Sequence, residues 1–295
     1  MTASPKPRHV VVVGAGIFGT STALHLARLG LDVTIVNDGA PSNGASGRSL
    51  SWLNSARRAD TAYHRLRLAG IDRYRTLAAT RPEAASWLRF DGGLTWDADD
   101  EANQIASMWQ LEQDIGYDSL LLDPAEVGAV TPGIDASAIT PQGSIFNPGE
   151  GWVDLPSLID LLLNEFRSRG GKLVQDAGRV RIVATGGRAR GVVTAGGTPV
   201  EADAVVLAVG PATPCMLALD RSPSPRRHAD FTSLEDQTDQ DRPPCRAEYA
   251  ACCGAPDAGW RTCFGFGMVG GRSRGQLRRH LHRARQNRKG TARRS

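Results

Sequence analysis

Hydrophobic positions near the N-terminus form two different patterns in close succession. Residues 10–13 are four consecutive valines, a run typical of a strand that is buried on both faces. Residues 32–36 (DVTIV) predict a second strand. Between them lies an apolar helical face that ends at Gly30 and consists of Ala23, Leu24, Leu26, Ala27 and Leu29. Strand, helix and strand fall within about 30 residues, which is the length of a βαβ unit.

A glycine fingerprint joins the first strand to this helix. Gly14, Gly16 and Gly19 stand in the spacing G-x-G-x-x-G, which is typical of dinucleotide-binding proteins. The first glycine permits a tight turn, the second lets the backbone approach a pyrophosphate, and the third lets the helix pack closely on the sheet. The helix opens after these glycines, so its free N–H groups and its dipole favour a phosphate there. Ile17 and Phe18 are therefore expected among the cofactor contacts.

The end of the second strand departs from this fingerprint. An acid is expected about 20 residues after the glycines to bind the ribose hydroxyls, but the aligned residue is Asn37, followed by Asp38. An amide can still bond a hydroxyl without charge assistance. We therefore expect ribose binding through Asn37, or through Asp38 if the strand ends one residue later.

Regular patterns return further along the chain. Residues 63–77 predict a helix, and Asp154 is placed to cap a further helix that Gly170 ends. A strand around Leu173 comes next. Four later segments complete the pattern, namely two hairpin strands (180–184 and 191–194), their turn (186–188) and a buried strand (204–208).

Composition divides the chain near residue 216. Residues 1–216 carry 19 Lys and Arg against 23 Asp and Glu, whereas residues 217–295 carry 16 against 8 and contain four of the five cysteines. This tail shows neither helical nor strand periodicity, so we expect it to be a poorly structured, solvated basic segment. Its charge gives no specific indication of nucleic acid.

Several classes of protein are excluded on composition. No apolar run reaches the roughly 20 residues of a membrane span, and residues 1–8 contain no apolar signal region. The cysteine and histidine spacing matches no standard metal site, so we predict none. A cytoplasmic enzyme that uses a flavin or a nicotinamide remains as the natural class.

Several separated motifs over residues 8–216 together resemble the D-amino-acid oxidase superfamily of FAD-dependent oxidoreductases. This superfamily includes glycine and sarcosine oxidases and D-amino-acid dehydrogenases. The motifs are VGAGIFG (13–19), GASGRSLSWLN (44–54), GWVDLPSL (151–158), Val180 with Gly191-Val192, and AVVLAVG (204–210). The resemblance implies FAD as cofactor and hydride transfer from an amine or D-amino acid, with hydrolysis of the resulting imine.

The resemblance also implies further cofactor contacts. Ser46, Gly47 and Arg48 would line the FAD phosphates or the flavin edge, and these residue types can offer donors to phosphate oxygens. Val180 would contact the adenine with its backbone, and Gly210 would let the last strand pass close to the dinucleotide. Substrate-binding Arg and Tyr residues come mostly from the C-terminal half of family members, where this chain departs from them, so no catalytic residue is assigned.

The expected fold is α/β, a Rossmann-like FAD-binding domain with an incomplete α+β substrate domain and a poorly structured basic tail. The expected boundaries are 8–56 for the βαβ unit and phosphate loop, 57–150 for the partial substrate domain, 151–216 for the return to the FAD-binding domain, and 217–295 for the tail. A chain truncated or shifted in frame after residue 216 would have little or no turnover. Two alternatives remain: an NAD(P)-binding enzyme of another family, and a non-catalytic binding module with a basic tail.

Overall fold

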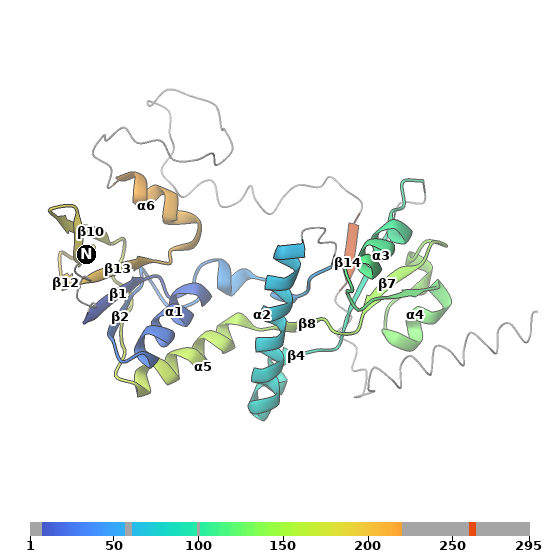
Figure 1. Ribbon diagram of the computed structural model, residues 1–295, viewed down its shortest axis with the longest axis horizontal. Coiled ribbons are helices and arrows are strands. Elements are labelled where there is room, and N and C mark those ends of the chain that lie inside the picture. Colours follow the sequence, from blue (N-terminus) through green and yellow to red (C-terminus); the bar gives the residue numbers. More distant parts are fainter. Residues whose placement is uncertain (1–7, 57–60, 99–100, 220–259, 264–295) are drawn as a thin grey trace, which may run out of the picture. The chain divides into compact units, whose positions relative to one another are not determined.

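The computed structural model describes residues 8–56, 61–98, 101–219 and 260–263 of the 295-residue chain. These residues fall into two compact units (Figure 1). The first contains residues 8–49 and 154–219, and the second contains the described residues of 50–153 together with 260–263. The first unit is therefore built from two stretches that are far apart in the sequence.

A parallel four-stranded sheet in the order β13-β1-β2-β9 forms the centre of the first unit. Its strands are β1 (His9–Val13), β2 (Asp32–Val36), β9 (Lys172–Val174) and β13 (Ala204–Leu207). The predicted βαβ unit is confirmed. The chain leaves β1 toward β2 on one side and returns as β13 on the other, so the strand order reverses at β1. Dinucleotides bind at such switch points, outside the carboxyl ends of the strands.

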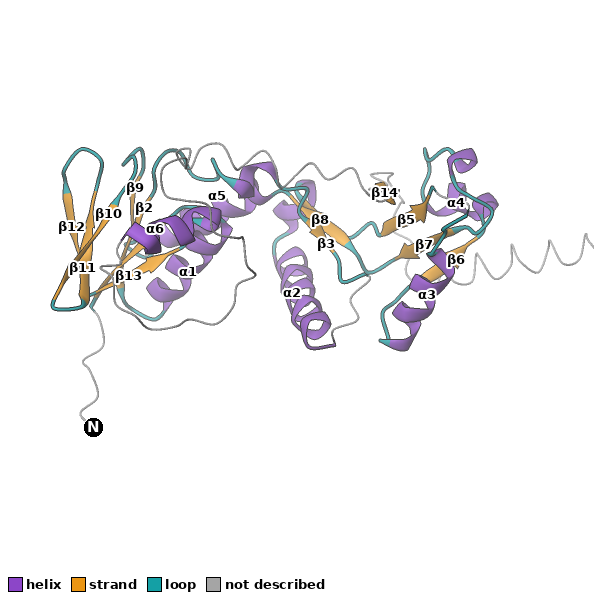
Figure 2. Ribbon diagram, turned by 90° about the horizontal axis from the view of Figure 1, so that it is seen from above, coloured by secondary structure: helices purple, strands orange, loops and turns teal. Residues whose placement is uncertain are grey.

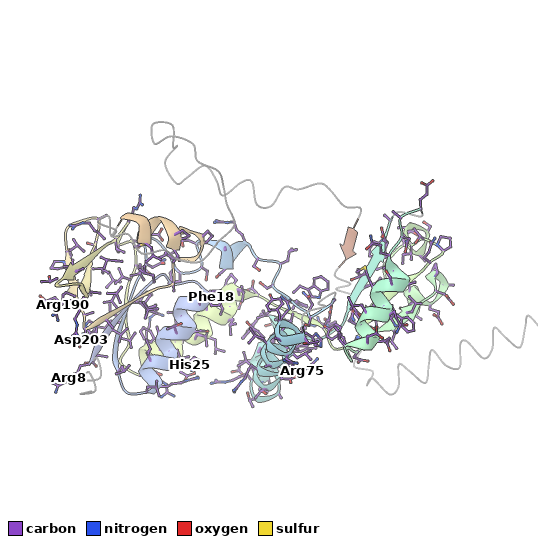
Figure 3. The ribbon with its side chains drawn as sticks, turned by 45° about the horizontal axis from the view of Figure 1, so that its top comes forward. Arg8, Phe18, His25, Arg75, Arg190 and Asp203 are labelled. Carbon is purple, nitrogen blue, oxygen red and sulfur yellow. The ribbon has the colours of Figure 1, made fainter. Side chains whose placement is uncertain are left out.

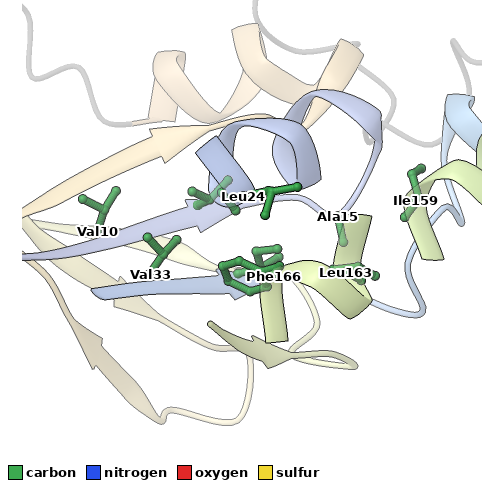
Figure 4. Close-up of a cluster of buried hydrophobic side chains, with 10 residues drawn as sticks. Val10, Ala15, Leu24, Val33, Ile159, Leu163 and Phe166 are labelled. Atoms are coloured by element: carbon green, nitrogen blue, oxygen red, sulfur yellow. The ribbon is translucent and has the colours of Figure 1, made fainter. Parts of the chain in front are cut away.

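Helices cover one face of this sheet. They are α1 (Ile17–Arg28) and α5 (Leu155–Ser168), and the unit also contains η1 (Ala45–Arg48), η4 (Gly210–Ala212) and α6 (Thr213–Leu219). Val10 and Val12 of β1 point to this face and form a buried cluster with side chains of α1, β2 and α5 (Figure 4). The predicted cap of α5 is confirmed, since the Asp154 carboxylate accepts a hydrogen bond from the Ser157 N–H at 3.0 Å.

A three-stranded antiparallel meander covers the other face (Figure 2). Its strands are β10 (Arg181–Thr185), β11 (Arg188–Val193) and β12 (Pro199–Glu201). Val11 and Val13 of β1 pack here with Val180 and Val192. The four valines are thus buried on both sides, as predicted, because alternate side chains point to opposite faces. The predicted hairpin is also confirmed.

The last strand of the sheet departs from the sequence prediction in one respect. Residues 204–208 predict a buried strand, but all four residues of β13 are only half-buried. In the described part of the chain β13 pairs only with β1 and lies at the edge of the sheet, which leaves its other side open.

The second unit is built on two antiparallel sheets, with orders β14-β5-β7-β6 and β3-β8-β4. The strands are β3 (Trp52–Leu53), β4 (Leu88–Arg89), β5 (Gly93–Asp97), β6 (Leu120–Leu122), β7 (Ser144–Asn147), β8 (Gly151–Val153) and β14 (Trp260–Cys263). The helices are α2 (Thr61–Thr80), η2 (Pro82–Ser86), α3 (Ile105–Asp114), α4 (Pro124–Val130) and η3 (Ala136–Ala138). The helix predicted over residues 63–77 is confirmed as α2.

Strand β14 lies within the stretch for which the sequence predicts little packed structure. Its four residues pair antiparallel with β5, from Trp260 opposite Asp97 to Cys263 opposite Leu94, so that expectation is wrong at this point. Residues 220–259 and 264–295 lie outside the described residues, and the expectation for them stays a prediction. Among the helices that the structure describes, none has the length and apolar character needed to cross a membrane.

Candidate dinucleotide-binding site

The glycine turn lies at the carboxyl end of β1, at the switch point of the sheet. The Gly14 N–H bonds the Val36 carbonyl oxygen at 2.9 Å, and its φ of +107° lies in a region that favours glycine. A Cβ on Gly14 would contact the Ala208 carbonyl oxygen, and one on Gly19 would contact the carbonyl oxygen of Gly14. The turn and the close packing of α1 therefore require both glycines, as predicted.

Gly16 has space that the other two glycines lack. It precedes α1 with an ordinary φ of −80°, and a Cβ there would meet only the Ser46 hydroxyl at 3.1 Å. That hydroxyl accepts a hydrogen bond from the Ile17 N–H at 3.1 Å. The predicted phosphate loop, which the structure forms as η1, is thereby held at the first turn of α1. Phe18 on this turn is 78% exposed and points outward (Figure 3).

Asn37, directly after β2, is buried and bonded to the protein's own backbone. Its Oδ1 accepts from the Ala15 N–H at 2.8 Å, and its Nδ2 donates to the carbonyl oxygens of Gly39 and Ala40, both at 2.9 Å. The backbone of Asn37 is also paired, with Val174 and Ala177. Asn37 therefore fastens the glycine turn to the segment that follows β2.

Asp38 and Arg48 are joined through Asn43. The Asn43 amide donates to the Asp38 carboxylate at 3.2 Å, and Arg48 donates to the Asn43 carbonyl oxygen at 3.0 Å. Asp38 and Arg48 are both exposed. A Cβ on Gly47 would contact the Ser42 carbonyl oxygen, so the tight fold of this loop requires a glycine at that position. The structure thus gathers an exposed carboxylate, an exposed guanidinium and a hydroxyl on one short segment.

The two remaining predicted residues are Val180 and Gly210. Val180 is buried against the sheet, and the preceding Gly178 N–H bonds the Asp38 carbonyl oxygen at 3.2 Å. Gly210 begins η4 just beyond β13 and is exposed, with a φ of +57°. Every predicted cofactor residue thus belongs to the first unit.

Three contacts at this site could not be predicted from the sequence. The Ala15 N–H donates to Asn37 Oδ1, and the Ala15 carbonyl oxygen accepts from the Ser42 N–H at 3.2 Å. The carbonyl oxygen of Ala208 lies so close to Gly14 that a Cβ there would contact it. All three use backbone atoms, which carry no signature in residue type. One local feature of the sequence does indicate a turn here. It is the Ser42-Asn43-Gly44 segment, in which Ser42 adopts a positive φ of 63°.

The second unit holds a buried polar cluster that the sequence analysis did not identify. Tyr117 donates to a Glu150 carboxylate oxygen at 2.6 Å and accepts from the Ser55 N–H at 2.9 Å. Trp52 donates to the other Glu150 oxygen at 2.7 Å, and the Ser55 hydroxyl lies 2.9 Å from His64 Nδ1. Burial, and then the charge of Glu150, raises the pKa of Tyr117, so the phenol remains a donor.

One protein-family model matches almost the whole chain. The model described as DAO, FAD dependent oxidoreductase, matches residues 9–294. The matched range extends beyond residue 216, where the motifs seen in the sequence end. FAD is the cofactor of this family, which removes the NAD(P) alternative.

Individual similar proteins match this chain over a shorter stretch or at low sequence identity. The tRNA 5-methylaminomethyl-2-thiouridine biosynthesis bifunctional protein MnmC of Chromohalobacter salexigens is 45% identical over 82 residues, 27% of this chain and 12% of that protein. Glycine oxidase from Bacillus cereus superposes with a TM-score of 0.62 at 23% identity, over 72% of this chain and 58% of its own. Iminodiacetate oxidase from Chelativorans gives a TM-score of 0.59 at 25% identity, over 71% and 57%. This chain thus spans less than two thirds of each.

Proposed function

Because the chain belongs to the DAO family of FAD-dependent oxidoreductases, we propose that it binds FAD at the glycine turn. We propose further that the reaction of this fold is the oxidation of an amine or an amino acid, with turnover that depends on a working C-terminal stretch. The proposed contacts to FAD are Gly14, Gly16, Ile17, Phe18, Gly19, Asp38, Ser46, Gly47, Arg48, Val180 and Gly210. Asn37, which the sequence also assigns to FAD, is buried and bonded to backbone atoms of Ala15, Gly39 and Ala40.

One observation carries the proposal for the cofactor. The fingerprint stands where the strand order reverses, with the first turn of α1, the end of β2 and the exit of β13 around it. The three glycines fit a pyrophosphate, because Gly14 and Gly19 are fixed by backbone contacts and Gly16 keeps a Cα surface without a side chain. Arg48 adds an exposed positive charge on η1, whose Ser46 bonds the first turn of α1.

The substrate class is inferred from the family. The chemistry that FAD supplies is hydride uptake from the carbon beside an amine nitrogen, after which water hydrolyses the imine to a carbonyl compound and an amine or ammonia. Glycine oxidase and iminodiacetate oxidase are among the similar structures, which favours a small amino acid or secondary amine as substrate. We leave the catalytic residues unassigned.

The visible spectrum of the purified full-length chain tests the proposal directly. We expect flavin bands near roughly 370 and 450 nm, and release of FAD, identified by mass, after denaturation. A folded chain that shows no flavin bands even after incubation with excess FAD would contradict the proposal.

A substitution at Gly16 tests the assigned position. The Gly16→Val side chain is compatible with the observed φ but would occupy the space of the pyrophosphate. We expect Gly16→Val to reduce the FAD retained after gel filtration at least tenfold without loss of folded protein. Gly70→Val, on α2 where a Cβ meets nothing within 4 Å, is the matched control and should retain FAD as the wild type does. Equal retention by Gly16→Val would show that FAD binds elsewhere.

A further inference from the structure

The residue after β2 is not free to bind a ribose. An amide has two N–H donors, and both donors of Asn37 are used by the carbonyl oxygens of Gly39 and Ala40, while its Oδ1 accepts from Ala15. The residue is 5% exposed. A ribose hydroxyl could therefore approach only the one remaining lone pair of a buried oxygen.

The backbone around Asn37 also explains why the usual acid is missing. Two carbonyl oxygens point at its Nδ2. A carboxylate in the same place would face both of them with an acceptor and would bury its charge. This segment has thus adopted a conformation that an amide satisfies and an acid does not.

Asp38 offers what Asn37 cannot. Its carboxylate is exposed and accepts one hydrogen bond from Asn43, whereas a carboxylate has about four acceptor sites. The segment carrying Asn43 is fastened to the glycine turn at two points, through Ser42 to Ala15 and through Ser46 to Ile17. The carboxylate is therefore held on a segment whose position is fixed relative to the pyrophosphate site.

Resting on the proposed binding of FAD at the glycine turn, we propose that Asp38 binds the adenosine ribose of FAD and that Asn37 is a positioning residue. Asn37 acts through the backbone of Ala15, Gly39 and Ala40, and it holds the glycine turn against the segment after β2. The division of roles makes opposite predictions for the two neighbouring positions.

The test compares binding of FAD and of FMN, which lacks the adenosine, by titration of the apoprotein. Asp38→Asn should weaken FAD binding about tenfold, since a charge-assisted hydrogen bond to a hydroxyl is lost, and should leave FMN binding and the apoprotein melting temperature unchanged. Asp32→Asn, an exposed acid at the other end of β2, is the matched control and should change neither.

Asn37→Asp should lower the melting temperature of the apoprotein and weaken FAD binding. Tighter FAD binding by Asn37→Asp at an unchanged melting temperature would overturn the proposal, as would unchanged FAD affinity of Asp38→Asn. Absence of FAD binding by the wild type would contradict the proposed function instead, so the two failures are distinguishable.

Discussion

At the scale of the residue, Tyr117 connects more of the second unit than any pattern in the sequence suggests. Its hydroxyl joins β3, through Ser55 just beyond that strand, to Glu150 just before β8. His64 on α2 contacts the Tyr117 ring edge-on, with ring centroids 5.4 Å apart. Glu150 is fully buried, and a buried carboxylate is tolerated only when donors surround it.

Removal of this hydroxyl should therefore destabilise the protein. Tyr117→Phe leaves the Ser55 N–H without its acceptor and removes one donor from buried Glu150, so we expect a loss of about 1–3 kcal/mol in the free energy of unfolding. Chemical denaturation measures it. The control is Tyr63→Phe, because the Tyr63 hydroxyl accepts an exposed hydrogen bond from Arg67 at 3.2 Å. Equal stability of the two variants would show that the buried cluster contributes nothing.

Residues also differ in how well the sequence predicts them. Gly14 and Gly19 are predictable because their roles depend on backbone conformation and close approach, which only glycine satisfies. Asn37 and Tyr117 are not, because their partners lie 22 and 33 residues away, at Ala15 and Glu150. No local pattern reports such pairs.

At the scale of the element, one ion pair links α1 to α5. Arg28 donates from Nε and from a terminal nitrogen to the two oxygens of Glu165, at 3.0 and 2.8 Å, and Arg169 donates to the same carboxylate at 3.0 Å. The hydrogen bonds from Arg28 are the main cause that lowers the pKa of Glu165. The same two helices cover the sheet that carries the glycine turn.

The contribution of this pair should depend on pH. Because the pKa of Glu165 is lower in the folded state than the unfolded value of about 4.3, its stabilisation is present above that value and is lost as pH falls through the folded pKa. The side chains are 40% and 24% exposed, so we expect only about 0.5–1 kcal/mol.

Melting temperatures of Glu165→Gln and the wild type, compared from pH 7 downward, measure this effect. The variant should melt lower at pH 7, and the difference should vanish in acid. Glu83→Gln, in an exposed pair with Arg81 at 3.6 Å, is the control and should show no such difference. A difference for Glu165→Gln that is constant with pH would mean that packing, not charge, is responsible.

Long elements were predictable and short ones were not. The valines of β1, the apolar face of α5 with its Asp154 cap, and the hairpin of β10 and β11 all have a period and an end signal. Strands β3 and β4 have two residues each, too few for an alternation to be recognised. They exist because β8 pairs with both, which is a property of the folded chain.

At the scale of the whole molecule, the stretch beyond α6 is the part on which pattern and family match differ. Its clustered basic residues and missing periodicity predict a segment without a buried face, whereas the family match extends to residue 294. We expect limited trypsin digestion to remove most of it and to leave a core that ends near Leu219, the last residue of α6. Mass spectrometry of the fragments gives the cleavage sites.

For the same reason, we expect this chain to show little or no turnover. Peroxide release and dye reduction with D-amino acids, glycine or sarcosine should stay at background even with FAD added, since the family's substrate-binding residues come mostly from its C-terminal half. A protease-resistant C-terminal stretch together with rapid amine oxidation would show instead that this stretch is a divergent but working substrate domain.

Two of the connections between the units, after residue 49 and before residue 154, join neighbouring ends of β3 and β8 in the second unit. Strand β3 pairs antiparallel with β8, with Trp52 opposite Trp152, and the Ser51 carbonyl oxygen accepts from the Val153 N–H at 3.2 Å. Residues 52–152 could therefore be replaced by a short glycine-serine turn that joins these two ends. Both buried clusters of the first unit consist entirely of residues before position 49 or after position 154, so its core would stay complete.

We accordingly expect a spliced chain of residues 8–51 and 153–219 to fold and to bind ADP, which carries the adenosine and pyrophosphate of FAD. Every proposed contact to that half of the cofactor lies in this unit, so the Kd for ADP should remain within about threefold of the full chain's, well under the 1.4 kcal/mol that corresponds to tenfold. Isothermal titration measures it, and the spliced chain with Gly16→Val is the control that should not bind. A folded spliced chain that binds no ADP, beside a full chain that does, would show that the second unit contributes directly to the nucleotide site.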